Sequence, residues 1–334
     1  MPQVRLPYSL RSIPGIDRKG PRGIDPKYLF LDVAIFRLVY NYQAMPVQNY
    51  PPQRIAVVAH PHITEAVHEA EQISRYLETQ GLHTANGLLD DLDLQQRVQA
   101  REFDLLIALG GDGTMLRAGH LCAPLGVPIL GINLGHFGFL IEVRGHQWQD
   151  VILRLLDGDY WLENRMMLCA QQFRRDQCIG KWDVLNEIVV CRGKIVRPVR
   201  LEASVDGRHL TTYIADGLIA ATPTGSTAYA LAVGGPILPP ELRNILLVPV
   251  APHLSVDRAI ILAEGASVSI TAYTDHDAVL SVDGQTPIDL INGDRVEARA
   301  GDHAVQFVRF QDPGYFYRNL TPHMSQNPSA ANLR

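Results

Sequence analysis

The sequence predicts an α/β fold in which a doubly wound parallel sheet is followed by a mostly antiparallel β-sandwich domain. Its length of 334 residues and hydrophobic content of 46% are enough for two separate cores. Buried-strand and helix patterns alternate over residues 54–145, which is typical of parallel strands joined by helices. From residue 161 to 301 strand-like alternation prevails, which favours an antiparallel β domain.

The first part has the elements of a Rossmann-like sheet. A helix is expected after the first strand, with Thr64 as its N-cap and Gly81 at its end, because apolar residues recur at helical spacing between them. A second helix is expected over residues 115–120, directly after a glycine-rich turn. Buried strands are expected at residues 54–60, 104–109 and 127–132.

The second part begins with a helix over residues 148–156, which Gly158 ends. Asp206-Gly207 then signals a hairpin turn after a strand. The tail from Asn319 is polar with little pattern, so we expect it to fray or to dock locally. The strands with the clearest alternation are expected at residues 200–205, 267–273 and 279–282.

Four segments follow from these patterns. Residues 1–53 form a basic, proline-rich extension with a short apolar stretch at 28–40 that could make one docking helix. The remaining divisions are an α/β nucleotide-binding domain at 54–145, a β-rich dinucleotide-binding domain at 146–301, and a C-terminal segment at 302–334 that is expected to pack back on the first domain.

Charge and cysteine content exclude several classes of protein. The net charge is −5, made of +4 on residues 1–53 and −9 on the rest, which argues against a general nucleic-acid or membrane-surface binder. The four cysteines form no CxxC pair, which argues against a structural zinc site or a disulfide framework and favours the reducing cytoplasm. No uncharged apolar run is long enough for a transmembrane helix.

The glycine-rich turn Gly110-Gly-Asp-Gly-Thr114 is the strongest functional signal. Glycines after a buried strand let the backbone approach a ligand, and the following helix N-terminus favours phosphate. The turn matches neither a P-loop nor GxGxxG. A cradle for phosphate has no need of an anion unless that anion accepts a proton, binds a metal or orients a hydroxyl, so Asp112 is the candidate general base. The alternative is a tight turn in which Asp112 caps the helix.

Three further stretches admit both a functional and a plain structural interpretation. The hydroxyl-rich turn at 222–227, followed by a short helix at 227–233, suits a nucleotide but equally a helix-capping turn. Asn186-Glu187 at the start of a strand is, taken alone, usually solvated. Asp283-Gly284 is most simply a hairpin turn. The histidines form no HExxH motif and are expected at the surface or behind a site.

Taken together and in order, these stretches resemble the NAD kinases, which phosphorylate NAD to NADP. The resemblance covers roughly residues 54–309, and TPTGSTAY is its most specific motif, since lipid kinases and phosphofructokinases carry loops similar to GGDGT. The matching stretches are Gly110–Thr114, Asn133–Leu140, Asn186-Glu187, Asp216–Tyr229 with Gly234–Pro236, and Val282–Gln285.

The resemblance implies an enzyme that transfers phosphate from ATP to the 2′-hydroxyl of the adenosine ribose of NAD. It implies Asp112 as the catalytic residue, Mg²⁺ or another divalent metal held by the donor phosphates without protein side-chain ligands, and a homodimer or homotetramer. The residues it places along the nucleotides are Gly110, Gly111, Gly113, Thr114, Arg117, Asn186, Glu187, Arg197, Asp216, Thr224, Thr227, Ala228, Tyr229, Ala230, Leu231, Ala232 and Gln285.

This chain departs from the family pattern at three places, the first being the extension 1–53, which has no counterpart in compact members. Ile214 stands where members often have a basic residue, which bears on the choice between oxidised and reduced substrate. Cys169-Ala170 replaces an acidic ending. Two alternatives remain open on the sequence: a lipid kinase of the diacylglycerol kinase type, and a non-catalytic dinucleotide sensor.

Overall fold

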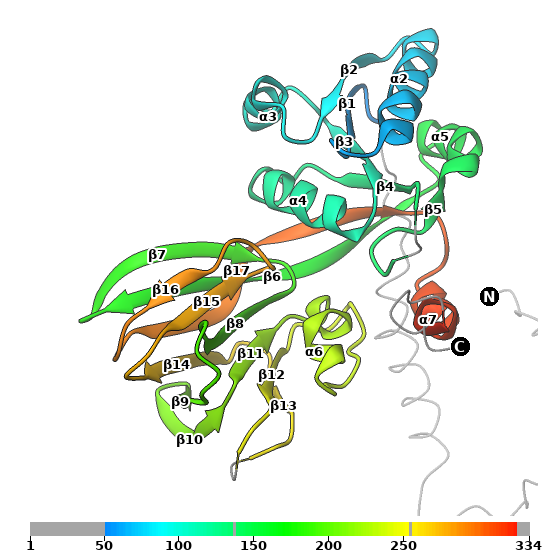
Figure 1. Ribbon diagram of the computed structural model, residues 1–334. Coiled ribbons are helices and arrows are strands. Elements are labelled where there is room, and N and C mark those ends of the chain that lie inside the picture. Colours follow the sequence, from blue (N-terminus) through cyan, green and yellow to red (C-terminus); the bar gives the residue numbers. More distant parts are fainter. Residues whose placement is uncertain (1–50, 136–137, 254–255, 326–334) are drawn as a thin grey trace, which may run out of the picture. The chain divides into compact units, whose positions relative to one another are not determined.

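The computed structural model describes residues 51–135, 138–253 and 256–325 (Figure 1). Contacts divide the chain into Met1–Val47 and Gln48–Arg334. The extension proposed for residues 1–53, with its helix at 28–40, therefore lies almost wholly outside the described residues.

Four parallel strands form the first part of an 11-stranded sheet, in the order β4-β3-β1-β2. Every residue of β3 and β4 is buried because helices cover both faces of this sheet. The short β5 (Val143–Arg144) pairs with β4. The four strands are β1 (Arg54–Ala59), β2 (His83–Leu88), β3 (Leu105–Gly110) and β4 (Ile129–Asn133).

The side chains of β1 alternate between two cores, which confirms a doubly wound sheet. Ile55 and Val57 pack with the buried faces of α2 (Thr64–Thr79) and α5 (Trp148–Leu156). Their neighbours Ala56 and Val58 pack on the opposite face, with α3 and α4. These two helices are α3 (Leu92–Gln99) and α4 (Asp112–Cys122), and short 3₁₀ turns lie at Ala123–Leu125 and Gly145–Gln147.

The parallel sheet continues into an antiparallel part through one long strand. Phe307 of β17 (Arg295–Arg309) pairs with Ile129 of β4. Both halves of β17 pair antiparallel with β6, and its first half also pairs antiparallel with β14. Figure 1 shows β6 and β17 running together between the two parts. The remaining antiparallel strands are β6 (Trp161–Arg174), β7 (Gln177–Val184), β9 (Val199–Val205), β10 (Arg208–Ala215) and β14 (Ser267–Tyr273).

A separate six-stranded sheet packs against this antiparallel part. Its order is β13-β12-β11-β8-β15-β16, and all pairs are antiparallel. Apolar side chains from both sheets share one core, which includes Leu201, Tyr213 and Leu280, so this part is a β-sandwich as predicted. The strands are β8 (Glu187–Arg192), β11 (Gly217–Ala221), β12 (Ile245–Val250), β13 (Ile260–Leu262), β15 (Ala278–Val282) and β16 (Ile288–Leu290).

Several local predictions need correction. The N-cap of α2 is Ile63 with no side-chain cap bond, so Thr64 opens the helix instead of capping it. The polar tail from Asn319 continues a helix, α7 (Tyr315–Ser325), which the buried aromatic rings of Tyr315 and Phe316 anchor. Strand β2 and helix α3 were not predicted from the sequence. For β2, the reason is that its sequence HTANGL has few apolar residues.

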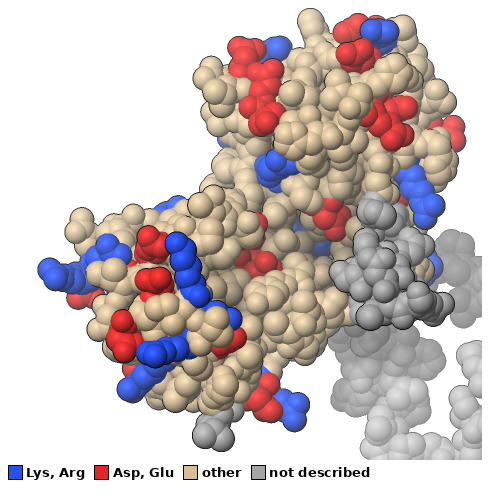
Figure 2. All heavy atoms as spheres, viewed as in Figure 1, with Lys and Arg blue, Asp and Glu red and all other residues tan. Residues whose placement is uncertain are grey.

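Two segments lie across the divisions drawn from the sequence. Helix α5, which begins after residue 145, packs its buried residues into the core of the parallel sheet. Residues 302–309 belong to β17 and join the two parts. No helix among the described residues is long and apolar enough to cross a membrane. Figure 2 shows acidic and basic side chains interspersed on the face in view.

Candidate active site

The glycine turn lies at the carboxyl end of β3, where ligands of doubly wound sheets bind. Gly110 has φ +157°, and a Cβ there would lie 2.2 Å from Thr114 Oγ1, so the turn closes tightly on Thr114. By contrast, a Cβ at Gly111 or Gly113 would meet nothing within 4 Å. The fold therefore leaves open space at two of the three glycines.

Asp112 is the first residue of α4, which starts three residues earlier than predicted, and Gly111 is the N-cap. The carboxylate of Asp112 does not cap its own helix. It accepts hydrogen bonds from the backbone N–H of Phe139 (2.8 Å) and of Leu140 (3.1 Å), in the loop after β4. A Cβ at Gly138 would lie 2.1 Å from Asp112 Oδ1, so glycine is needed there for this contact.

The surroundings of Asp112 favour a base stronger than an exposed aspartate. Burial raises the pKa of Asp112, while the two N–H donors and the charges of Arg309 and Arg165 oppose that rise. A carboxylate that is held at both oxygens and has a raised pKa is suited to orient a hydroxyl and to receive its proton.

The hydroxyls of the TPTGST turn donate hydrogen bonds within the protein, and their contact with a nucleotide stays a prediction. Thr222 Oγ1 donates to Leu185 O (2.5 Å), and Ser226 Oγ donates to Pro223 O (2.6 Å). Thr227 Oγ1 donates to Thr224 O (3.0 Å). These bonds fix the 3₁₀ turn Gly225–Thr227 and the short α6 (Tyr229–Ala232) that follows it.

Asn186 and Glu187 are held against this turn. The carbonyl of Asn186 accepts from the Thr222 N–H at 2.8 Å, and a Cβ at Gly225 would lie 2.1 Å from that carbonyl oxygen. Glu187 is 7% exposed, so the expectation of a solvated pair is wrong for it. Burial and the charge of Asp283 raise the pKa of Glu187 to about 7, against an opposing hydrogen bond from the Tyr229 backbone.

Asp283 does more than form the predicted hairpin turn. Its φ of +48° and that of Gly284 (+68°) give the turn between β15 and β16. Its carboxylate accepts from the backbone N–H groups of Leu185, Asn186 and Glu187, at 2.7–3.0 Å. Asp283 thus positions the Asn186-Glu187 pair. Sequence reasoning did not select Asp283 as a site residue, although the DG pair was the available signal.

Asp216 and the residues of α6 lie beside this pair. Asp216 forms an ion pair with Arg192 at 3.2 Å, and burial together with the charges of Asp216 and Glu187 raises the pKa of the half-exposed Tyr229. Ala230 is buried in the core beneath α6. Leu231 is half-buried, as are Thr227 and Ala228 in the preceding turn, whereas Ala232 is exposed. Arg197 is exposed between β8 and β9, where its backbone N–H donates to the carbonyl of Ile195 at 2.9 Å.

Arg117 and Gln285 line one cavity of about 320 Å³, although one lies on α4 and the other after β15. His120, Asp90 and Gln95 complete its polar lining. The cavity adjoins the helix that starts with Asp112. Burial and the charge of Arg117 lower the pKa of His60, which follows β1. The structure thus brings these two predicted residues together.

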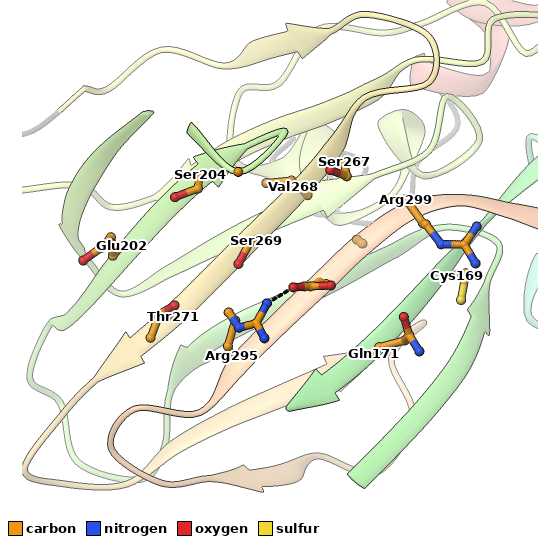
Figure 3. Close-up of a pocket in the computed structure, with 13 residues that line it drawn as sticks. Cys169, Gln171, Glu202, Ser204, Ser267, Val268, Ser269, Thr271, Arg295 and Arg299 are labelled. Atoms are coloured by element: carbon orange, nitrogen blue, oxygen red, sulfur yellow. Dashed lines mark ion pairs between the residues drawn. The ribbon is translucent and has the colours of Figure 1, made fainter. Parts of the chain in front are cut away.

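A second cavity, of about 350 Å³, contains none of the predicted site residues. It lies on the antiparallel part of the large sheet and is lined by side chains of β6, β9, β14 and β17 (Figure 3). Arg295 and Glu297, which form an ion pair, are among the lining residues, as are Ser204, Ser269 and Thr271.

The fold and the site define a nucleotide-dependent phosphotransferase: a glycine turn with a buried, backbone-held aspartate faces a β-rich part that carries a second, rigid turn. Comparison with family models gives the same class. Residues 54–160 match the ATP-NAD kinase N-terminal domain, and residues 185–310 match the ATP-NAD kinase C-terminal domain.

Curated relatives and solved structures agree. The chain is 38% identical over 275 residues to the NAD kinase of Chloroflexus aggregans, which covers 82% of this chain and 99% of that one. It is 41% identical over 231 residues to that of Heliobacterium modesticaldum, covering 69% and 81%. Yeast NADH kinase complexed with NADH superposes with a TM-score of 0.69 at 27% identity, covering 84% and 89%.

An NAD kinase from Archaeoglobus fulgidus shares the fold, with a TM-score of 0.66 at 24% identity over 82% of this chain and 99% of that one. The chain therefore belongs to the NAD kinase family.

Proposed function

We propose that this protein transfers the γ-phosphate of ATP to the 2′-hydroxyl of the adenosine ribose of NAD and releases NADP. Membership of the family supports the activity, and the relatives named NAD kinase support NAD as acceptor. The observation that carries the proposal is the geometry of Asp112, whose two carboxylate oxygens are fixed by Phe139 and Leu140 at the carboxyl edge of the sheet.

In this mechanism Asp112 orients the 2′-hydroxyl and receives its proton as phosphate is transferred. Phosphoryl transfer through a loose transition state depends mainly on positioning and on charge neutralisation. The raised pKa of Asp112, caused by burial, makes proton acceptance more favourable than at an exposed aspartate. Asn186 and Glu187 would hold the adenosine side of NAD, since they lie against the turn that leads to Tyr229.

Mg²⁺ is proposed as the cofactor, bound chiefly through the phosphates of ATP. Among residues 51–135, 138–253 and 256–325 no group of three or more His, Cys, Asp or Glu side chains could hold a metal ion. An ion that arrives with the donor phosphates would supply charge neutralisation there.

A homodimer or homotetramer in the cytoplasm is also proposed. The four cysteines are free, which suits a reducing compartment. Light scattering of the purified protein would test the oligomeric state, and a single 37.0 kDa species would contradict it.

The test of the activity is NADP formation from NAD and ATP by purified wild type, beside Asp112→Asn. We expect the variant to bind NAD but to turn over about 10²–10⁴-fold more slowly, the range of a lost general base. Equal rates for the two proteins would refute the role of Asp112.

Parallel assays separate the alternatives. Phosphorylation of diacylglycerol in place of NAD would identify a lipid kinase, and NAD binding without turnover by the wild type would identify a sensor. Other nucleoside triphosphates and polyphosphate, each in place of ATP, would define the donor range. NADH in place of NAD would show the effect of Ile214, which is 48% exposed beside Asp216.

A further inference from the structure

A cluster of charged side chains lies buried between the two parts of the site. Glu163 and Arg165 of β6, Arg309 of β17 and Tyr315 of α7 are each 2–4% exposed. One carboxylate oxygen, Glu163 Oε2, lies 3.0 Å from Arg165 Nη2 and 2.7 Å from Arg309 Nη2. Charges this deeply buried are stable only when each is paired, so the cluster has a defined arrangement.

One arm of the cluster reaches Asp112. Arg309 Nη1 donates to the carbonyl of Leu140 at 2.8 Å, and the N–H of the same residue, Leu140, donates to Asp112 Oδ1 at 3.1 Å. Leu140 is therefore held from both sides of its backbone. Any movement of the Arg309 guanidinium would be passed to the hydrogen bond that fixes the aspartate.

The other arm reaches the TPTGST turn. Arg165 Nη1 donates to Thr224 Oγ1 at 3.2 Å, and Thr224 is 4% exposed. The same guanidinium is tied to Glu163, so one carboxylate is linked to both loops of the site. The remaining nitrogen, Arg165 Nε, is buried without a hydrogen-bond partner in the described part of the chain.

Tyr315 of the C-terminal helix α7 contacts the other three residues of the cluster. Its hydroxyl lies 3.3 Å from Glu163 Oε2, to which it donates, and 3.4 Å from Arg165 Nη2. Its ring packs under the Arg309 guanidinium, 5.2 Å from ring centroid to Cζ. Tyr315 lies beyond residue 310, where the match to the family model ends.

We infer that α7 is a positioning element of the active site: Tyr315 fixes Glu163 and Arg165, and through them the Asp112 loop and the Thr224 turn keep one relative arrangement. This inference rests on the proposed function. It assigns catalytic importance to a helix that follows the residues matched by the family models.

Tyr315→Phe tests the inference, because it removes only the hydroxyl and keeps the ring over Arg309. We expect kcat for NADP formation to fall about tenfold while the KM values for NAD and ATP change less than twofold. Tyr317→Phe is the matched control, since Tyr317 lies on the same helix and is 58% exposed. Wild-type NADP formation is measured first, so failure of the proposed function would show there and not in the variant.

Hydrogen exchange gives a readout independent of turnover. The amides of residues 138–142 and 222–228 should exchange faster in Tyr315→Phe than in wild type, and at the wild-type rate in Tyr317→Phe. A kcat within twofold of wild type, or a change confined to KM or to melting temperature, would overturn the inference.

A second pair of variants tests the arm to Thr224 without touching α7. Thr224→Val removes the acceptor of the Arg165 hydrogen bond at similar volume, whereas Thr224→Ser keeps the hydroxyl. We expect Thr224→Val to reproduce the loss of kcat and Thr224→Ser to restore at least half of the wild-type value. Equal kcat for both variants would count against the inference even if Tyr315→Phe did not fold.

Discussion

Nε2 of His120 lies 2.8 Å from Oδ2 of Asp283, and this contact joins the last turn of α4 to the turn between β15 and β16. The Asp283 side chain is 0% exposed and the His120 side chain is 22% exposed. Because α4 begins with Asp112 and Asp283 holds the Asn186-Glu187 backbone, the contact links the helix that carries Asp112 to the Asn186-Glu187 pair.

Replacement of Asp283 should be strongly destabilising. Asp283→Ala leaves two buried backbone N–H groups and one part-buried group without their acceptor, and each buried group costs about 1–3 kcal/mol, so we expect unfolding free energy to fall by roughly 3 kcal/mol. Urea unfolding measures this. Asp302→Ala, at an aspartate whose side chain is 72% exposed, should change it by less than about 0.5 kcal/mol. Similar losses in both variants would mean that the N–H groups find other acceptors.

Glu187 should make stability depend on pH. Its pKa in the folded protein, about 7, exceeds the ordinary value of 4.5, so protonation favours folding and stability falls as pH rises from about 4.5 to 7. Glu187→Gln imitates the protonated form. It should therefore be more stable than wild type at pH 8, by an amount on the order of 3 kcal/mol, and nearly equal to it at pH 4.5.

Urea unfolding of wild type and Glu187→Gln across this range checks the prediction. A difference that does not change with pH would show that the pKa of Glu187 is not raised in the folded state. Glu202→Gln, at a partly exposed carboxyl on β9, supplies the control.

Gly138 should be needed for catalysis more than for folding. A Cβ at this position would collide with the Asp112 carboxylate, 2.1 Å away, so Gly138→Ala must displace the catalytic group or its loop. We expect kcat to fall at least about 100-fold. Gly135→Ala is the control in the same loop, because its Cβ would come no closer than 4.0 Å to Asn133 Oδ1. Comparable activity of the two variants would exclude a tight fit around Asp112.

The sequence was sufficient to predict the parallel strands. Leu105–Gly110 and Ile129–Asn133 are buried on both faces, and burial of this kind gives the continuous apolar runs that predict such strands. The sequence singled out Asp112 as a candidate base, a role that stays a prediction, and the structure shows the carboxylate held by two backbone N–H groups. The sequence could not show that Glu163, Arg309 and Tyr315 are in contact, because Arg309 lies 146 positions and Tyr315 lies 152 positions after Glu163 in the chain. Nor could it show the burial of Glu187, which depends on pairing of β8 with β11 and β15.

Gly113 offers a test in which stability and function should move in opposite directions. It lies in the first turn of α4, and a Cβ there would meet nothing within 4 Å, so the free protein has no need of glycine. Alanine is favoured over glycine inside helices by about 0.5–1 kcal/mol, and Gly113→Ala should therefore unfold at slightly higher urea concentration than wild type. If a nucleotide occupies this open space and touches the backbone, the added methyl group should raise the KM for NAD or ATP about tenfold or more.

Gly126→Ala, after α4, is the contrasting variant: its φ of +67° is strained for alanine, so it should lose stability while keeping both KM values. Unchanged KM values in Gly113→Ala would remove the reason for glycine at this position and would place the nucleotide elsewhere.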